Sequence, residues 1–557
     1  MSGSGSAGGS TTAGRVLDVL AGAGVRTVYG LPGVHNLAFW DALGEHRPRI
    51  LGVRHEQTTV YAADGAARAT GGLGVALTTT GPGAANTLAA FGEAAASRSA
   101  VVLVASDVPA SLRRPGRPRG LLHESPDQGA FFAPLAKAVL QPWTPEQAVA
   151  AAADAVTAAL SAPRGPVYLG IPADVAWAEA PAAKLRRMPQ PRPPDLTAVE
   201  MAVALLRRTD RVLIWAGGGA VAADAGEAVT DLAWRLGAPV VTTYAARGLL
   251  GVGHPLLIDA PPHEPEVEAL IGAADLLLVV GSALDAMTTR NQTMPRPPLL
   301  VRVDADERTA REGWPADVVV VGDAALTCAA LALRIPERAP WADEVYRVRD
   351  AVRRGVAADP RTAEAAAFLE ALEAAWPAAG DVVCDMAVAG YWTGGYAAMS
   401  RPRRLQYPIG WGTLGYALPA ALGAASATAR PVLAVSGDGG ATYALPELAT
   451  LVQERLPVCL LVVDDAGYGM LRFDQDAGGH PRRGVDLLGP DWVALAQAYG
   501  VAGREVTPVA DDGGADLRAA LAWAAGLRAP SLLHLPGAYL PPRTTSPRWS
   551  ELTPGST

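Results

Sequence analysis

The stretch Ser436-Gly437-Asp438-Gly439-Gly440 decides the fold prediction, together with Asp464-Asp465-Ala466-Gly467-Tyr468-Gly469, which begins 26 residues after Asp438. Each stretch lies at the end of a short apolar run that predicts a strand, Val432–Ser436 and Val458–Val463, and a predicted helix separates the two. A strand–helix–strand unit of this length puts both strands in one parallel sheet, with their carboxyl ends at the same edge. The sequence therefore predicts that the aspartates of the two stretches meet at a ligand-binding edge.

These residue types fit a diphosphate and a magnesium ion. Mg²⁺ prefers octahedral oxygen ligands, usually one or two carboxylates together with phosphate oxygens and water. Gly439 and Gly440 allow the backbone to approach a phosphate and to begin a helix whose amides face the anion. Either stretch alone is more often a turn or a loop, but the pair at this spacing predicts a diphosphate–magnesium site.

Apolar strands and Ala-rich helices alternate in three blocks along the chain. This alternation predicts an α/β fold of three doubly wound parallel-sheet domains. The predicted strands are Val25–Gly30, Val75–Thr79, Val101–Ala105 and Val167–Ile171; then Val212–Trp215, Val240–Thr243, Leu276–Val280, Leu300–Val303 and Val318–Val321; then Val382–Asp385, Val432–Ser436, Val458–Val463 and Ser531–Leu535. The predicted boundaries are a flexible tail at 1–12, a first domain at 13–179, a linker at 180–197, a central domain at 198–333, a helical connection at 334–361, a third domain at 362–540 and a C-terminal tail at 541–557.

Composition excludes several classes of function. The net charge of −8 over 557 residues argues against a nucleic-acid partner, which usually needs a basic face. No stretch of about 20 residues is apolar enough to span a bilayer, so we expect no membrane partner. The N-terminal sequence lacks the pattern of a signal peptide, and the three cysteines show no metal-ligand spacing, which together favour a cytoplasmic protein with reduced thiols.

The two quoted stretches resemble the signature of thiamine-diphosphate (ThDP) enzymes. The similar group contains acetohydroxyacid synthase, pyruvate oxidase and 2-oxo acid decarboxylases such as benzoylformate decarboxylase, and the chain looks closest to acetolactate synthase large subunits. The group's signature is GDG followed by NN at a distance that fits one strand–helix–strand unit. The resemblance implies pyrimidine-binding, central and diphosphate-binding domains, and a Mg²⁺ ion held by Asp438, Asp465 and the backbone carbonyl of Gly467. It implies that the diphosphate end of the cofactor is bound by Gly437, Asp438, Gly439, Gly440, Asp465, Gly467, Tyr468 and Gly469.

One departure from the signature concerns charge. Asp464 and Asp465 stand where the family usually has asparagine. Aspartate still binds Mg²⁺, but it adds negative charge beside a diphosphate. We therefore expect weaker cofactor affinity or a compensating arginine such as Arg472.

The segment Gly410–Ala421 resembles the family's sequence before GDG. The resemblance implies that Leu414 wedges the cofactor into a V shape and that the carbonyl of Gly412 accepts a hydrogen bond from its 4′-amino group. The same residues would also suit a glycine-rich packing turn.

A second family segment lies in the first domain, at Val53–Gly71, and it contains Arg54-His55-Glu56. By resemblance, Glu56 is the catalytic acid that hydrogen-bonds N1′ of the aminopyrimidine, and we expect a mostly buried carboxyl with a raised pKa. A helix-start acid stabilised by the helix dipole is the alternative reading. Two more loops resemble the family's cofactor loops, and they contribute Pro32, Gly33, Gly81 and Asn86. In this family the pyrimidine and diphosphate domains of one site come from different subunits, which implies a homodimer or homotetramer.

The reaction type depends on what meets the enamine left after a 2-oxo acid loses CO₂. Val34 and Thr79 stand where the family's decarboxylases carry polar or imidazole groups, and Thr79-Thr80-Gly81-Pro82-Gly83 is similar to the synthase loop. We therefore predict carboligation of a pyruvate-like 2-oxo acid to a carbonyl acceptor. A simple decarboxylase and a non-catalytic subunit with the same fold stay open as alternatives.

Other positions bear on the substrate and on a flavin. Asp474 stands where the synthases have a tryptophan, and Leu256–Pro265 lacks their flavin-loop glycines, which argues against bound FAD. His123 and Gln128 either bind substrate or cap a helix. The candidate substrate residues are Val34, Thr79, Thr80, His123, Gln128, Lys137, Met470 and Asp474.

Overall fold

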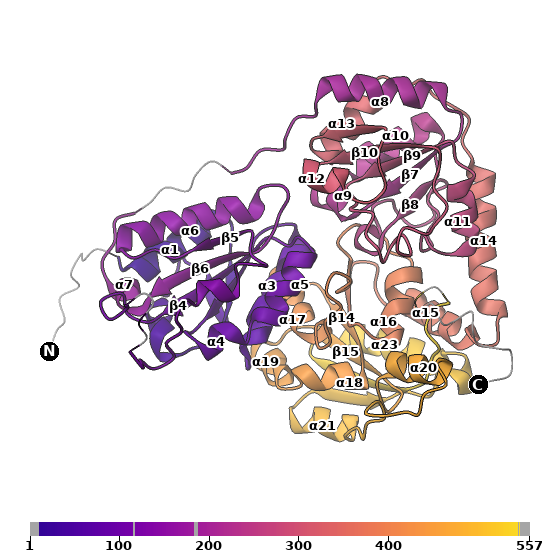
Figure 1. Ribbon diagram of the computed structural model, residues 1–557. Helices are drawn as coiled ribbons and strands as arrows, with labels where there is room; N and C mark the ends of the chain where they lie inside the picture. The colour runs from indigo at the N-terminus through magenta and orange to yellow at the C-terminus, as the bar shows by residue number, and fades with distance from the viewer. Residues whose placement is uncertain (1–9, 115–116, 118, 183–187, 544, 546–557) are drawn as a thin grey trace. The chain divides into compact units, whose positions relative to one another are not determined.

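The computed structural model describes residues 10–114, 117, 119–182, 188–543 and 545. It contains three parallel sheets covered by helices, which confirms the predicted α/β fold with three sheet domains (Figure 1). Parts of the predicted tails and linker, at 1–9, 183–187 and 546–557, lie outside the described residues. Within the described ranges, no helix is both long and apolar enough to cross a membrane.

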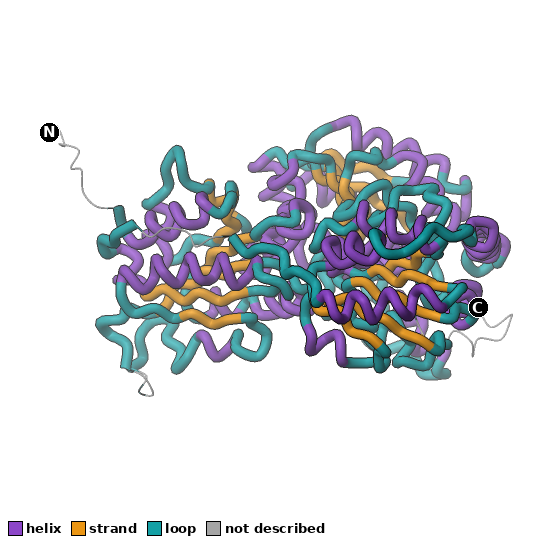
Figure 2. The backbone as a smooth tube through the Cα atoms, turned by 90° about the horizontal axis from the view of Figure 1, so that it is seen from above, coloured by secondary structure: helices purple, strands orange, loops and turns teal. Residues whose placement is uncertain are grey.

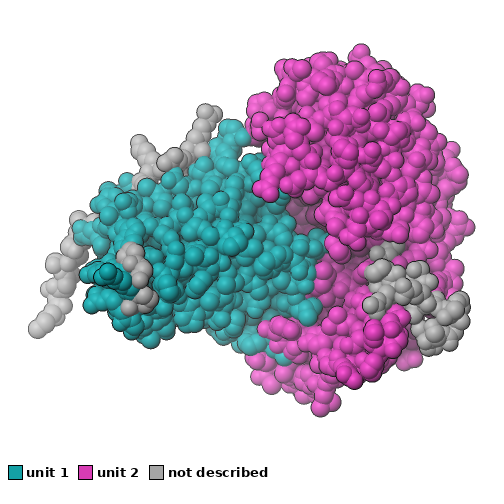
Figure 3. Space-filling view, in the orientation of Figure 1, with its two compact units in different colours: residues 1–190, 408–430, 444–458 teal, residues 191–407, 431–443, 459–557 magenta. Residues whose placement is uncertain are grey.

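Contacts divide the chain into two compact units (Figure 3). Unit 1 comprises Met1–Gln190, Pro408–Arg430 and Ala444–Val458, and unit 2 comprises the remaining three segments. The first sheet therefore belongs to unit 1, together with two helices that come from late in the chain. The central and third sheets belong to unit 2.

The first sheet has the strand order β2-β1-β3-β4-β6-β5. Helices cover both faces of this sheet (Figure 2). Its inner strands are therefore apolar at successive positions. The strands are β1 (Thr27–Gly30), β2 (Arg49–Gly52), β3 (Gly74–Thr78), β4 (Val101–Asp107), β5 (Ala138–Leu140) and β6 (Val167–Pro172). The helices of unit 1 are α1 (Thr12–Gly22), α2 (Leu37–Asp41), α3 (Glu56–Thr70), α4 (Pro82–Ala85), α5 (Leu88–Ala96), α6 (Pro145–Leu160), α7 (Ala173–Trp177), α17 (Ala417–Thr428) and α19 (Glu447–Glu454).

Helices α3 and α17 cross at very close range within unit 1. A Cβ atom added to Gly65 would lie 2.1 Å from the carbonyl oxygen of Ala420, and one added to Gly423 would lie 1.9 Å from that of Ala62. Only glycine allows two helix backbones to approach this closely. Tyr416 donates a hydrogen bond to Asp64 beside this crossing, at 2.8 Å. The crossing fixes α3, and therefore its first residue Glu56, against the segment 408–430.

The central sheet of unit 2 has the order β11-β10-β9-β7-β8 and one apolar core. Its strands are β7 (Val212–Ala216), β8 (Val240–Thr242), β9 (Leu276–Val280), β10 (Leu299–Asp304) and β11 (Val318–Val321). Its helices are α8 (Leu196–Arg208), α9 (Gly218–Ala222), α10 (Gly226–Leu236), α11 (Pro265–Gly272), α12 (Glu307–Arg311) and α13 (Ala324–Ala332), and α14 (Ala342–Ala358) follows them.

The third sheet has the order β13-β12-β14-β15-β17-β16, so the two predicted motif strands, β14 and β15, are neighbours. Its strands are β12 (Asp381–Cys384), β13 (Leu405–Gln406), β14 (Val432–Gly437), β15 (Val458–Asp464), β16 (Ala502–Glu505) and β17 (Ser531–Pro536). The accompanying helices are α15 (Ala363–Ala375), α16 (Val388–Tyr396), α18 (Asp438–Ala441), α20 (Gly469–Ala477), α21 (Trp492–Ala498), α22 (Val509–Asp512) and α23 (Ala515–Leu527). Cys328, Cys384 and Cys459 are buried free thiols, as expected.

Candidate cofactor-binding and active site

Two carboxylates stand at the carboxyl edge of the third sheet. Asp438 follows β14 and Asp465 follows β15. Both carboxyl oxygens of Asp438 and Oδ1 of Asp465 are buried and have no hydrogen-bond partner among the described residues. Burial raises the pKa of Asp438 to about 6, with the charge of Asp464 adding to the effect, and burial and the charge of Asp438 raise the pKa of Asp465 to about 6. Buried carboxylates of like charge at one sheet edge favour a bound cation there.

Asp464 points into a different set of contacts. Its Oδ2 accepts hydrogen bonds from Trp492 Nε1 at 2.8 Å and from His534 Nε2 at 3.0 Å, and its Oδ1 accepts from the backbone N–H of Ala466 at 2.8 Å. Ala466 has a left-handed backbone, with φ of 57°. Asp464 therefore fixes the turn that presents Asp465 and Gly467, and it does so as a carboxylate surrounded by donors.

Arg472 of α20 lies against the same turn. It donates to the backbone carbonyls of Asp465 and Ala466, each at 2.9 Å, and its Nε donates to Asp486 at 3.0 Å. Its positive charge opposes the rise in the pKa of Asp465. The arginine named from the sequence as a compensating charge therefore lies beside Asp465.

Gly439 and Gly440 have neighbouring side chains packed directly against their backbone. A Cβ on Gly439 would lie 2.6 Å from the ring of Tyr468, and a Cβ on Gly440 would lie 2.7 Å from Oδ2 of Asp385. That Asp385 oxygen accepts a hydrogen bond from Ser436 at 2.8 Å. Glycine is required at both positions because neighbouring side chains occupy the space of a Cβ.

A magnesium ion fits the residues present. Among the described residues, no cluster of three or more histidine, cysteine, aspartate or glutamate side chains is arranged to hold a metal ion. Asp438 and Asp465 offer two carboxylates, and Mg²⁺ takes its remaining oxygens from backbone carbonyls, a diphosphate and water. The unpartnered carboxyl oxygens match this demand, and Asp438, Asp465 and the carbonyl of Gly467 would hold the ion.

In unit 1, Glu56 opens helix α3 and lies near a glycine-rich loop. Asn86 donates a hydrogen bond from Nδ2 to Glu56 Oε2 at 3.1 Å, and a Cβ on Gly83 would lie 3.6 Å from Glu56 Oε1. The start of the helix is held by buried Glu447, which accepts hydrogen bonds from the backbone N–H groups of Arg54 and His55 at 2.9 and 3.2 Å. Glu56 itself is only partly buried in the single chain, whereas the sequence analysis expected a mostly buried carboxyl. It lies on the first turn of α3, at the edge of the sheet rather than under a helix.

The loops after β1 and β3 meet at this same edge. A Cβ on Gly33 would lie 2.6 Å from the side chain of Thr79, and a Cβ on Gly81 would lie 2.5 Å from the carbonyl oxygen of His123. Gly81 has a φ of 65° and donates its backbone N–H to Gln128 Oε1 at 2.6 Å. The structure thus brings the predicted residues Pro32, Gly33, Glu56, Thr79, Thr80, Gly81, Asn86 and His123 to one edge of the first sheet, and Val34, beside them, is exposed.

His35 is a residue of this edge that sequence reasoning missed. Its Nδ1 lies 2.9 Å from Thr80 Oγ1, which in turn lies 3.1 Å from Ser106 Oγ. The rings of His35 and His123 are edge-on, with centroids 5.9 Å apart. The pKa of His35 is lowered from its ordinary value, by burial first and by His123 second. The signal was present in the sequence as an imidazole directly after Val34, the position compared with decarboxylases.

Two predicted substrate residues have other contacts. Gln128 is fully buried, and its amide also donates to Ser106 O at 2.9 Å and Tyr168 OH at 2.7 Å, so it shapes the Gly81 loop. Lys137 precedes β5, which places it at the amino edge of the sheet, opposite the loops described above. Its Nζ donates to the carbonyls of Ser161 and Pro163, each at 2.6 Å. The structure does not bring Lys137 together with the other candidate residues of unit 1.

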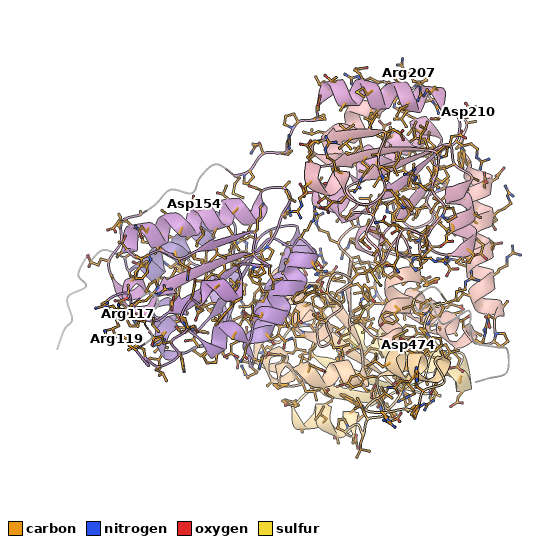
Figure 4. The ribbon with its side chains drawn as sticks, in the orientation of Figure 1. Arg117, Arg119, Asp154, Arg207, Asp210 and Asp474 are labelled. Carbon is orange, nitrogen blue, oxygen red and sulfur yellow. The ribbon has the colours of Figure 1, made fainter. Side chains whose placement is uncertain are left out.

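The remaining predicted residues lie on α20 and in the loop before α17. Met470 and Asp474 are one helical turn apart on α20, where Figure 4 labels Asp474. Burial raises the pKa of Tyr391 to about 12, and the charges of Asp474 and Asp385 add to this rise. Gly412, with φ of 70°, and Leu414 lie in the loop that leads into α17.

The chain matches three protein-domain families along its length. Residues 10–131 match the "Thiamine pyrophosphate enzyme, N-terminal TPP binding domain", residues 199–331 match the central domain of the same enzymes, and residues 385–535 match their C-terminal TPP binding domain.

Relatives and solved structures agree with these matches. The chain is 38% identical over 519 residues to the protein named "Probable 2-ketoarginine decarboxylase AruI" from Pseudomonas aeruginosa, and the aligned residues cover 91% of each chain. It is 31% identical to the acetolactate synthase large subunit of Parasynechococcus marenigrum, covering 88% of this chain and 82% of the relative. An X-ray structure of a thiamin diphosphate-dependent enzyme from Mycobacterium smegmatis shares the fold, with a TM-score of 0.78 at 23% identity, over 95% of this chain and 99% of that one.

The three domain matches together cover most of the chain, and they include the sheet edges that carry Glu56 and Asp438. The chain belongs to the thiamine pyrophosphate (thiamine diphosphate) enzyme family.

Proposed function

We propose that the protein is a ThDP- and Mg²⁺-dependent decarboxylase of 2-oxo acids that releases the aldehyde, and that its preferred substrate carries a cationic side chain. The observation that carries this proposal is the pair of imidazoles, His35 and His123, at the loop edge that holds Glu56. ThDP supplies the electron sink that allows a 2-oxo acid to lose CO₂.

Each residue of the two edges has a role in this proposal. Asp438, Asp465 and Gly467 would hold Mg²⁺ and through it the diphosphate, and Glu56, oriented by Asn86, would bind the pyrimidine and carry the proton that it exchanges. We propose that no FAD is bound. We also propose a homo-oligomer, at least a dimer, because in this family both kinds of domain are needed from different subunits.

The two histidines explain how the reaction would end in an aldehyde. After CO₂ leaves, the carbon that carried it must receive a proton, and a positioned imidazole accelerates such a transfer by about 10²–10⁴-fold. Thr80 holds the His35 ring through Nδ1, and Nδ1 is fixed at 2.9 Å from the hydroxyl. His35 and His123 are therefore the groups we assign to the proton transfer.

The acidic residue on α20 supports a cationic substrate. Asp474 stands where acetolactate synthases have a tryptophan, and its charge acts on Tyr391 together with that of Asp385. A carboxylate at this position suits a guanidinium, whose planar donors pair with carboxylates. The 38% identical relative is named for 2-ketoarginine, a 2-oxo acid with such a side chain.

Carboligation in the manner of acetolactate synthase is the second candidate. Val34, which is 69% exposed, offers no proton, and Thr79 keeps the synthase type of loop. The synthase relatives are also matched over most of the chain. In that case the product would be a hydroxy-ketone instead of an aldehyde.

A substrate panel separates these candidates. Purified protein with ThDP and Mg²⁺ is given 2-ketoarginine, pyruvate or a neutral 2-oxo acid of similar length, and CO₂, aldehyde and hydroxy-ketone are measured. We expect 2-ketoarginine to have the highest kcat/KM, and Asp474→Asn to lower it about tenfold or more, the value of a charge-assisted hydrogen bond. Asp476→Asn, on the same helix and paired with Arg482, is the matched control. Equal kcat/KM values for the charged and neutral acids would refute the substrate class.

A further inference from the structure

His534 lies between two carboxylates next to the metal edge. Its Nε2 is 3.0 Å from Asp464 Oδ2, and its Nδ1 is 2.8 Å from Glu505 Oε2. His534 comes from β17 and Glu505 from its neighbour β16, so the sheet itself sets this arrangement. The side chains of His534 and Asp464 are 16% and 17% exposed, so water screens their interaction only partly.

Each ring nitrogen of His534 faces one carboxylate oxygen at hydrogen-bond distance. A neutral imidazole donates from one nitrogen only, whereas the doubly protonated ring donates from both. With a carboxylate oxygen at hydrogen-bond distance from each nitrogen, the doubly protonated ring satisfies every contact. The two ring nitrogens therefore connect Asp464 of β15 to Glu505 of β16 through one side chain.

The position of His534 bears on the negative charge that Asp464 and Asp465 add beside a diphosphate. Two carboxylates stand where we propose that a diphosphate binds, and a basic side chain of unit 2 lies near each of them. Arg472 lies against the backbone of Asp465, and His534 lies against the side chain of Asp464. Asp464 ends β15 and directly precedes Asp465, so its carboxylate lies next to the metal edge.

We propose that His534, with both ring nitrogens carrying a proton, is a positioning residue for the cofactor: it neutralises Asp464 and orients it, and thereby allows an aspartate at this position beside a Mg²⁺–diphosphate site. Trp492 shares the orienting role, since its Nε1 donates to the same oxygen at 2.8 Å, but it carries no charge. The proposal rests on the metal-dependent cofactor binding of the proposed function, and it is independent of the substrate.

A double-mutant cycle on the full-length protein tests the proposal. ThDP affinity is measured by calorimetry with and without Mg²⁺ for wild type, His534→Gln, Asp464→Asn and the double variant. We expect His534→Gln to weaken Mg²⁺-dependent ThDP binding about tenfold, the scale of one close charge pair. In the Asp464→Asn background the same substitution should change affinity less than about twofold, because no charge remains to be neutralised. Trp492→Phe, which removes an uncharged donor from Asp464, should cost less than His534→Gln.

The outcomes separate this proposal from the proposed function. Equal losses in both backgrounds, or no loss in wild type, would overturn the role of His534 while leaving the metal site intact. ThDP binding that is independent of Mg²⁺ in wild type would overturn the metal site itself. If His534→Gln does not fold, the double variant must fold and bind ThDP like Asp464→Asn, and a double variant that also fails to fold contradicts the proposal.

Discussion

Replacement of His35 tests the proposed end of the reaction. In His35→Gln the imidazole is lost but a polar side chain remains beside Thr80. Because a positioned acid contributes about 10²–10⁴ in rate, aldehyde release should fall by that factor, while the loss of CO₂ that precedes it is slowed less. In single-turnover experiments, CO₂ should therefore appear before aldehyde.

The hydrogen bond of His35 gives a second, smaller effect. Thr80→Val keeps the volume of a buried side chain and removes the hydroxyl that lies 2.9 Å from His35 Nδ1. The lost hydrogen bond orients the His35 ring and is worth about 1 kcal/mol, so its removal predicts a roughly fivefold fall in the rate of aldehyde release. His46→Gln, an exposed histidine of the same unit, is the control and should leave the rate unchanged.

The pH dependence has a defined sign. Burial and His123 lower the pKa of His35 below 6.5, and Asp107 only partly opposes this. A proton donor with a lowered pKa loses its proton at lower pH, so aldehyde release should decline as the pH rises through a value below 6.5. Wild-type and His35→Gln enzymes that release aldehyde at the same rate and with the same pH profile would refute the assignment.

Three further predictions concern the cofactor edge and the fold. Asp438→Ala should abolish Mg²⁺-dependent ThDP binding in calorimetry, and unchanged affinity would show that the site is elsewhere. Gly65→Ala places a Cβ 2.1 Å from the carbonyl of Ala420 and should cost about 1–3 kcal/mol or more in unfolding, whereas Gly355→Ala, in open space on α14, should not destabilise. Burial lowers the pKa of His263 to about 4. As the pH falls below 6.5, this imidazole is therefore protonated in the unfolded chain but stays neutral in the folded chain. Protonation of His263 in the unfolded chain should lower the free energy of unfolding by about 3 kcal/mol by about pH 4. Acid unfolding curves of His263→Gln should lack this loss of stability.

The central strands were predictable because burial on both faces leaves a nearly continuous apolar run. The predicted Leu276–Val280 and Val318–Val321 agree with β9 and β11 residue for residue. The missed strands, β2, β5, β13 and β16, are short and lie at or near the edges of their sheets. Arg49–Gly52 and Ala502–Glu505 are partly exposed and carry charged residues, so they lack the apolar pattern that identifies a strand.

The site divides in the same way between local and non-local information. Asp438 and Asp465 were predictable since one strand–helix–strand unit brings them to the same edge. His534 is 70 residues from Asp464, and only the order β15-β17-β16 brings the two together. Lys137 was judged from its sequence surroundings, which did not show that it precedes its strand and so lies at the opposite edge.

The most direct test of the account is the stoichiometry of CO₂ and aldehyde formed from 2-ketoarginine by the wild-type protein and by Glu56→Gln. The account predicts one aldehyde for each CO₂, full dependence on added ThDP and Mg²⁺, and suppression of both products in Glu56→Gln. Release of CO₂ with a hydroxy-ketone and little aldehyde, or turnover that persists in Glu56→Gln, would contradict it.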